Sequence, residues 1–211
     1  MSSNAKNVLD FYVLCNKLKN VIRTGWKDWH VNKERIESVA EHIYGTQMLA
    51  IAMHSEYKYD LDISKVIYML AVHELEEILI GDLTQFQISR EEKEKLGHEA
   101  IEKVLESLNN KDYIKSIILE FDERKTKEAK FAYFCDKSEC DIQCRLYDGE
   151  NTVDVHDVRN KLNFHDDEVL KMLDDGKSWS DMWMTFGQRR YGYDENFMEV
   201  SNYAKNNKIN K

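Results

Sequence analysis

The segment His73-Glu74-Leu75-Glu76-Glu77 places one imidazole and three carboxylates within an apolar stretch of the chain. Mostly apolar residues precede it at 67–71 and follow it at 78–80. A helix through this region is apolar on nearly every side, which is typical of a helix in the middle of a domain. Burying even an uncharged polar group without a partner costs roughly 2–7 kcal/mol. A divalent cation would satisfy these groups, because imidazole and carboxylate are common metal ligands.

A structural interpretation of the same segment is also open. His73 would then be a hydrogen-bonded core histidine, and the glutamates would reach solvent. Two other residues favour a metal. His42 lies beside the apolar face of a predicted helix, where it is a plausible second ligand, and Asp136 lies beside the apolar residues Ala132 and Cys135 of a later helix, where a carboxylate needs a partner.

The elements that would position these groups are helices. Apolar residues recur at helical spacing, strand-type alternation is scarce, and the chain has no proline and eight glycines. We therefore predict an all-α fold, with a charged loop over 27–37 that Trp29 anchors. The predicted helices span residues 4–22, 38–57, 62–81, 89–108, 111–121, 126–147, 166–175, 178–190 and 194–206.

Several helix ends have recognisable capping residues. Ser38 with Glu41 and Ser89 with Glu92 match the capping-box pattern of helix starts. Asp62 or Ser64 is expected to cap the central helix. Gly25 offers the left-handed conformation that ends a helix, so the first helix should end near Gly25. Gly81 is expected to close the central helix.

The composition narrows the classes of function. At 211 residues the chain suits one domain, and no linker or repeat divides it. The formal net charge of −9 argues against nucleic acid as a partner, since that would require a clustered basic face. The first seven residues lack the apolar core of a signal peptide and no apolar run approaches 18 residues, so we expect a cytoplasmic protein without membrane contact. The four cysteines match no common zinc or disulfide pattern, and we interpret them as reduced thiols.

Taken in order along the chain, His42, the doublet His73-Glu74 and Asp136 resemble the metal-binding pattern of the HD-domain phosphohydrolases. That family has a histidine, then a His-Asp doublet on a buried helix, then a distant aspartate, all on one divalent metal. The resemblance is stronger to its 5′-deoxynucleotidase branch and covers roughly residues 8–150, leaving 150–211 as additional C-terminal helices. It rests on Arg23-Thr24-Gly25-Trp26, Glu37-Ser38-Val39-Ala40-Glu41-His42, His73 through Thr84, and, more weakly, Ala129-Lys130-Phe131 with Asp136-Lys137 and Gln143.

The resemblance implies one helical bundle over 1–211, with a metal site between its central helices. The implied ligands of one divalent ion are His42, His73, Glu74 and Asp136, and the implied general acid/base is Glu77, with Glu76 at the surface. Mixed His/carboxylate ligation suits Mn, Co, Fe, Ni or Zn, and Mg is also open. Arg23, Trp26 and Asp82 are implied to contact a nucleotide substrate. Arg35 is a second candidate for the phosphate, since a guanidinium suits it, and a surface salt bridge is equally open for this residue. Lys137, next to Asp136, is a further candidate to add positive charge. A second doublet, His165-Asp166, lies among polar residues, where Asp166 is more simply a helix cap.

One departure from the family pattern is the doublet itself, which is His73-Glu74 rather than His-Asp. Glutamate keeps the oxygen ligand but adds a methylene and a rotatable bond.

The leading hypothesis from the resemblance is a homodimeric metal-dependent enzyme that releases phosphate from 5′-deoxynucleoside monophosphates. The alternatives are a non-catalytic nucleotide-binding or regulatory protein, and a phosphohydrolase of nucleoside triphosphates, cyclic nucleotides or alarmones.

Overall fold

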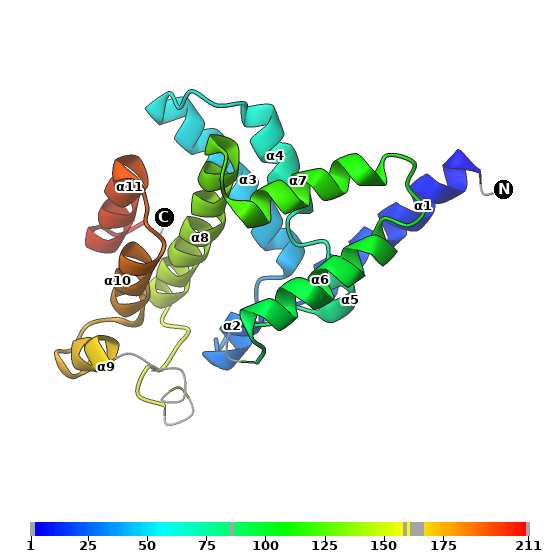
Figure 1. Cartoon of the computed structure of the whole chain (residues 1–211). Coiled ribbons are helices and arrows are strands. Elements are labelled where there is room, and N and C mark those ends of the chain that lie inside the picture. Colours follow the sequence, from blue (N-terminus) through cyan, green and yellow to red (C-terminus); the bar gives the residue numbers. More distant parts are fainter. Residues whose placement is uncertain (1–2, 85–86, 158–159, 161–166, 210–211) are drawn as a thin grey trace. The chain divides into compact units, whose positions relative to one another are not determined.

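The computed structural model describes residues 3–84, 87–157, 160 and 167–209, and these residues form an all-α structure (Figure 1). Within these ranges the β-type backbone pairing amounts to one isolated antiparallel bridge, between Ile22 and Ser38. The all-α prediction is confirmed. No helix in the described ranges has the length and apolar character that crossing a membrane requires. The doublet His165-Asp166 lies outside the described residues.

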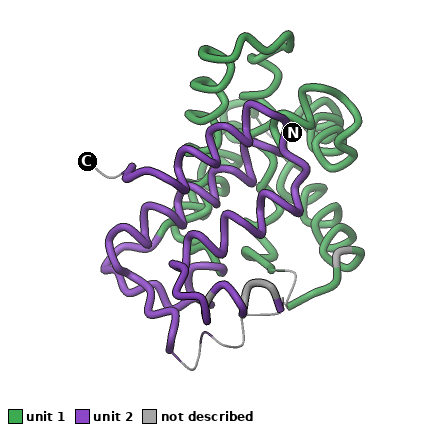
Figure 2. Tube along the Cα trace, turned by 90° about the vertical axis from the view of Figure 1, so that its left-hand side faces the viewer, with its two compact units in different colours: residues 1–24, 37–133 green, residues 25–36, 134–211 purple. Residues whose placement is uncertain are grey.

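The chain divides into two compact units, each built from two segments (Figure 2). Unit 1 comprises Met1–Thr24 and Glu37–Tyr133, and unit 2 comprises Gly25–Ile36 and Phe134–Lys211. Unit 1 holds α1 (Asn4–Cys15), the 3-10 helix η1 (Asn16–Asn20), α3 (Val39–Tyr57), α4 (Ile63–Val72), α5 (Glu77–Ile80), α6 (Arg90–Val104) and α7 (Lys111–Glu123). Most of α2 (Thr24–Asp28) and of α8 (Lys127–Gly149) belongs to unit 2, with α9 (Asp167–Asp174), α10 (Trp179–Arg190) and α11 (Glu195–Asn206). The expectation of one domain over 1–211 stays a prediction.

Local capping fixes where the helices of unit 1 begin. The Ser38 hydroxyl accepts the Glu41 amide and the Glu41 carboxylate accepts the Ser38 amide, so the predicted capping box of α3 is present. Ser89 and Glu92 form the same arrangement at α6. Asp62 caps α4 through the amides of Ser64 and Lys65. These three starts are confirmed, because a cap depends on residues only two or three positions apart.

The helix that we predicted over 62–81 is interrupted at the predicted metal ligands His73 and Glu74, so this prediction is wrong. α4 ends at Val72, and α5 begins only at Glu77. Between them the amides bond three residues back, as in Leu75 to Val72 and Glu77 to Glu74, so the chain tightens into turns. His73 and Glu74 therefore lie in a turn between two helices. Gly81 closes α5 with a φ of 75°, as expected.

The first helix also ends earlier than predicted, at Cys15 rather than near residue 22. The Asn16 side-chain amide donates to the Tyr12 carbonyl at 2.8 Å, a local bond of the kind that competes with helix continuation, and η1 follows. Gly25 does not stop this helix, since it lies inside α2. The predicted loop over 27–37 therefore starts as a short helix.

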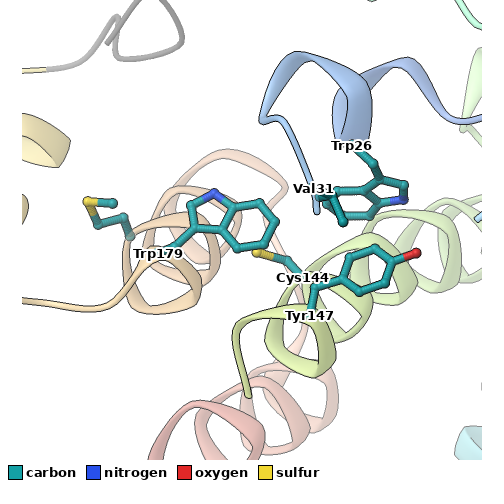
Figure 3. Packing of buried hydrophobic residues seen from close by; sticks show 6 residues of the cluster. Trp26, Val31, Cys144, Tyr147 and Trp179 are labelled. Atoms are coloured by element: carbon teal, nitrogen blue, oxygen red, sulfur yellow. The ribbon is translucent and has the colours of Figure 1, made fainter. Parts of the chain in front are cut away.

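The core of unit 2 is aromatic (Figure 3). The indole of Trp26, from the N-terminal segment of this unit, packs edge-on against Tyr147 and Trp179, with ring centroids 5.4 and 6.1 Å away. Edge-to-face pairs at such distances stabilise a core beyond simple area burial. Further aromatic residues of the C-terminal segment, Trp179, Tyr193 and Phe197, are all buried. All four cysteines are free thiols.

Candidate active site

The turn after α4 orients the imidazole of His73. Nδ1 donates to the Leu70 carbonyl at 2.7 Å, and since a carbonyl only accepts, the neutral ring carries its proton on Nδ1. The lone pair on Nε2 then faces the Glu74 carboxylate, with Oε1 3.6 Å away. Phe121 of α7 packs against the ring at a centroid distance of 5.1 Å. A backbone bond on one ring nitrogen, with the other directed at further ligands, is typical of metal-binding histidines.

His42 brings a second imidazole to the same carboxylate. It lies in the first turn of α3, is fully buried, and its Nε2 is 3.9 Å from Glu74 Oε1. The separations of 3.6 and 3.9 Å exceed those of hydrogen bonds. Ligand atoms about 2.1 Å from a common metal lie about 3.0–3.4 Å apart, so a small tightening would bring these three atoms to ligand spacing.

Asp136 is the remaining predicted donor. It follows the fully buried Ala132 by one turn of the continuous helix α8 and is itself buried. It belongs to unit 2, whereas His42, His73 and Glu74 belong to unit 1, so its place in the donor set stays a prediction. The longer Glu74 side chain is 13% exposed, whereas His42 and His73 are buried. Two imidazoles and a carboxylate at these separations fit a divalent metal ion.

Glu77, the predicted acid/base, is the first residue of α5 and is 1% exposed. This excludes its interpretation as a solvent-facing carboxylate. Its Oε1 accepts a hydrogen bond from Lys93 Nζ at 3.3 Å, and Oε2 has no hydrogen-bond partner among the described residues. Burial and then the nearby Glu74 and Asp82 carboxylates raise the pKa of Glu77 well above its ordinary value, against the opposing effect of Lys93 and Arg23.

Glu76 is not the surface residue that we predicted. Its Oε2 is buried without a hydrogen-bond partner in the described structure, and its Cγ packs toward Gly97 of α6. Burial and then the Glu74 carboxylate raise the pKa of Glu76 to about 8. The prediction failed because the turns over 73–76 rotate this side chain away from the position that a continuous helix would give it.

Arg23 and Asp82 lie together beside Glu74. The Arg23 guanidinium is 3.8 Å from Glu74 Oε1 and 3.7 Å from Asp82 Oδ1. Asp82 Oδ2 also accepts the Thr24 amide at 2.7 Å, which ties the segment after α5 to the start of α2. Both charged side chains are largely buried. The structure thus places a cation and a second carboxylate next to the predicted metal ligands.

Trp26, Arg35 and Lys137, which were also predicted to bind the substrate, lie outside this cluster of Arg23, Asp82 and Glu74. Trp26 is 2% exposed inside the aromatic core of unit 2, so its indole has a packing role, and its contact with a nucleotide stays a prediction. Arg35 is exposed on the N-terminal segment of unit 2. Lys137 Nζ pairs with Asp136 Oδ2 at 2.9 Å, and although burial opposes its charge, Asp136 raises the pKa of this lysine above its ordinary value. For Arg35 and Lys137 a role in binding phosphate also stays a prediction.

Sequence reasoning did not single out Lys93. It stands in the first turn of α6 directly after a capping box, and it differs in no obvious way from the exposed Lys95 nearby. Gly97 follows Lys93 by four residues, so the two lie on the same face of α6. A small residue on that face could have indicated close contact with another helix.

The family model described as HD domain matches residues 15–188. A Dictyostelium discoideum protein named 5′-deoxynucleotidase HDDC2 is 33% identical over 164 residues, which are 74% of this chain and 83% of that protein. The Xenopus laevis protein of the same name is 33% identical over 70% of this chain and 72% of its own length. In Schizosaccharomyces pombe, 5′-deoxynucleotidase hdd1 is 26% identical over 78% of this chain and 86% of its length.

Solved structures support the fold. The PH0347 protein from Pyrococcus horikoshii OT3 has a TM-score of 0.65 at 20% identity and is covered over 98% of its chain, with 94% of this chain. A predicted metal-dependent phosphohydrolase from Magnetospirillum magnetotacticum MS-1 has a TM-score of 0.58 at 20% identity, with 97% of each chain covered. At these identities the likeness shows a common fold.

Proposed function

We propose that this chain, which belongs to the HD-domain family, is a metal-dependent 5′-deoxynucleotidase that releases phosphate from 5′-deoxynucleoside monophosphates. The family match supports the resemblance that the sequence carries. Relatives named 5′-deoxynucleotidase span most of the chain at 26–33% identity and support the substrate class.

The observation that carries the proposal is the buried donor set. His42 Nε2 and His73 Nε2 lie 3.9 and 3.6 Å from Glu74 Oε1, and a buried carboxylic acid, Glu77, starts the next helix. We propose that these three residues and Asp136 hold one divalent ion, either a transition metal of the series Mn, Co, Fe, Ni and Zn or Mg. Such an ion, when bound, lowers the pKa of a coordinated water and polarises a phosphoryl oxygen.

The chain's own groups supply the remaining requirements of hydrolysis. Glu77 Oε2 is the oxygen available to exchange a proton with the attacking water or with the departing 5′ oxygen, because Oε1 is bonded to Lys93. The guanidinium of Arg23 suits a phosphate, which it would bind with two parallel hydrogen bonds. In exchange, Arg23 would give up part of its interaction with Glu74 and Asp82.

Four further residues belong to the proposal: Asp82 and Trp26 from the family resemblance, and Arg35 and Lys137 from their positive charge. Asp82 would recognise the deoxyribose, and Trp26 would flank the nucleotide. Arg35 and Lys137 would add positive charge for the phosphate. Lys137 is the better placed of the two cations, since it already lies against Asp136.

The test is phosphate release from paired 5′-ribo- and 5′-deoxyribonucleoside monophosphates, each with Mn, Co or Mg and with a chelator. We expect metal-dependent turnover that favours the deoxy substrates. Glu77→Gln should lower kcat by about 10²–10⁴, the usual contribution of general acid–base catalysis. Asp136→Asn should abolish both turnover and the rise in Tm that added metal produces, and the exposed Glu99→Gln on α6 is the matched control.

Retention of wild-type turnover by both Glu77→Gln and Asp136→Asn would refute these roles. If nucleotides raised the Tm without any phosphate release, and Glu74→Asp then restored turnover, a binding or regulatory function would replace the proposal. Turnover of triphosphates, cyclic nucleotides or alarmones instead would keep the enzyme and change its substrate.

We also propose a cytoplasmic homodimer, again from the resemblance. α1 supports self-association, since none of its residues is buried and it exposes Val8, Leu9, Tyr12 and Val13. Sedimentation at micromolar concentration should give about twice the 25.0 kDa of one chain. A mass near that of one chain would exclude the dimer.

A further inference from the structure

Lys93 links two parts of the candidate site. It lies in the first turn of α6, and its ammonium donates to Glu77 Oε1 at 3.3 Å and to the Leu83 carbonyl at 2.9 Å. Leu83 directly follows Asp82, the predicted sugar-binding residue. One side chain therefore holds the buried acid and the segment that carries Asp82.

The contact depends on how closely α6 approaches α5. Gly97 lies one turn after Lys93, and a Cβ at this position would already be 3.4 Å from Glu76 Cγ. This is an ordinary van der Waals separation, so α6 packs closely against the Glu76 side chain and brings Lys93, one turn before Gly97, within reach of Glu77. Lys95, two residues along, is exposed and provides a matched cation on the same helix.

The charges around Lys93 favour a cation at this position. Four carboxylates, those of Glu74, Glu77, Asp82 and Glu76, act on its ammonium and favour the charged form over the cost of burial. A buried carboxylate that loses its one cationic hydrogen-bond donor keeps the full cost of desolvation. Removing Lys93 would therefore free the Glu77 side chain to leave its present orientation.

We propose that Lys93 is a positioning residue of the reaction. It holds Oε1 of Glu77 so that Oε2 is the oxygen presented for proton transfer, and it fixes the Leu83 carbonyl beside Asp82. Lys93 itself touches neither the substrate nor the reacting atoms. This inference rests on the proposed nucleotidase function, because it assigns the geometry that Glu77 needs for that reaction.

The test compares Lys93→Met, Lys93→Arg and Lys95→Met in the metal-loaded enzyme. Lys93→Met should lower kcat about ten- to a hundredfold, the equivalent of losing one charged hydrogen bond in the transition state. KM should stay near that of the wild type, because Asp82 keeps its bonds to Thr24 and Arg23. Lys93→Arg should restore part of kcat, since a guanidinium can still donate to Oε1, and Lys95→Met should match the wild type.

An unchanged kcat in Lys93→Met would overturn the inference while leaving the nucleotidase function intact. So would equal losses in Lys93→Met and Lys93→Arg, or a loss confined to KM. If the wild type itself released no phosphate, the proposed function would fail on its own. The contact would then be tested by thermal unfolding of Lys93→Met, Glu77→Gln and the double variant. The Lys93→Met change should lower the Tm less in the Glu77→Gln background than in the wild type, and strictly additive shifts would overturn the contact itself.

Discussion

Replacing Gly187 with alanine should destabilise unit 2, although the same change in most helices is stabilising. Gly187 lies within α10, where alanine normally gains about 1 kcal/mol over glycine. Here a Cβ would lie only 2.4 Å from Asp141 Oδ2 and 2.9 Å from Oδ1. Asp141 is 1% exposed, and its Oδ2 accepts a hydrogen bond from the Tyr193 hydroxyl at 2.9 Å. The carboxyl group must move, and that bond must lengthen or break.

The size of the effect follows from two costs and one gain. Inserting a methyl group into a well-packed site costs about 1–3 kcal/mol. Loss of the buried hydrogen bond adds about 1–3 kcal/mol. Less the gain in helix propensity of about 1 kcal/mol, the net loss is about 1–5 kcal/mol. For a chain of 211 residues this corresponds to a fall in Tm of roughly 2–20 °C.

Differential scanning calorimetry of the two glycine variants is the assay. Gly97→Ala in α6 is the control, because the nearest atom to its new Cβ is Glu76 Cγ at 3.4 Å, an ordinary van der Waals distance. Its Tm should stay the same or rise slightly. A Gly187→Ala protein as stable as Gly97→Ala would refute the reasoning, since it would mean that Asp141 moves aside at no cost.

Two further substitutions test the electrostatics and the backbone. Burial raises the pKa of Asp141 to about 8 from its ordinary 3.8. Between pH 3.8 and about 8 the folded state therefore holds a proton that the unfolded state releases. The free energy of unfolding should fall as the pH rises through this range, by up to about 1.4 kcal/mol per pH unit. Asp141→Asn should flatten this decline and raise the Tm at pH 7, whereas a decline that persists in the variant would assign it to other groups. Lys58 ends α3 at a φ of 51°, in the left-handed region that favours glycine. Lys58→Gly should therefore raise the free energy of unfolding in urea by about 0.5–1 kcal/mol. An unchanged midpoint of the urea transition would show that the left-handed conformation costs lysine little at this position.

The features that sequence patterns predicted correctly are local ones. The capping boxes at Ser38 and Ser89 need only residues three apart, and both are present. The break after Val72 was missed because the apolar pattern continues unbroken through it. What stops the helix is an arrangement of contacts that periodicity does not encode, including the bond from His73 to Leu70 and the packing of Phe121 on the imidazole.

The candidate site shows the same division. A sequence pattern links the four proposed ligand positions and Glu77, and their roles stay predictions. The buried Glu76 carboxylate oxygen and the contact of Lys93 with Glu77 could not be predicted, since both depend on how closely α6 packs against α5. Trp26 follows Arg23 by three residues, yet it belongs to the core of the other unit. No linear pattern marks that boundary at Gly25.

The two-segment construction of each unit affects how the chain is made on the ribosome. Trp26 emerges early, but its partner Trp179 is synthesised roughly 150 residues later, about 8–30 s at 5–20 residues per second. During that interval an indole destined for burial has no Trp179 to pack against. Cutting the gene between Tyr133 and Phe134 would split α8 and remove residues 25–36 from the rest of unit 2. Neither unit therefore corresponds to a continuous stretch of the gene that could be expressed or exchanged by itself.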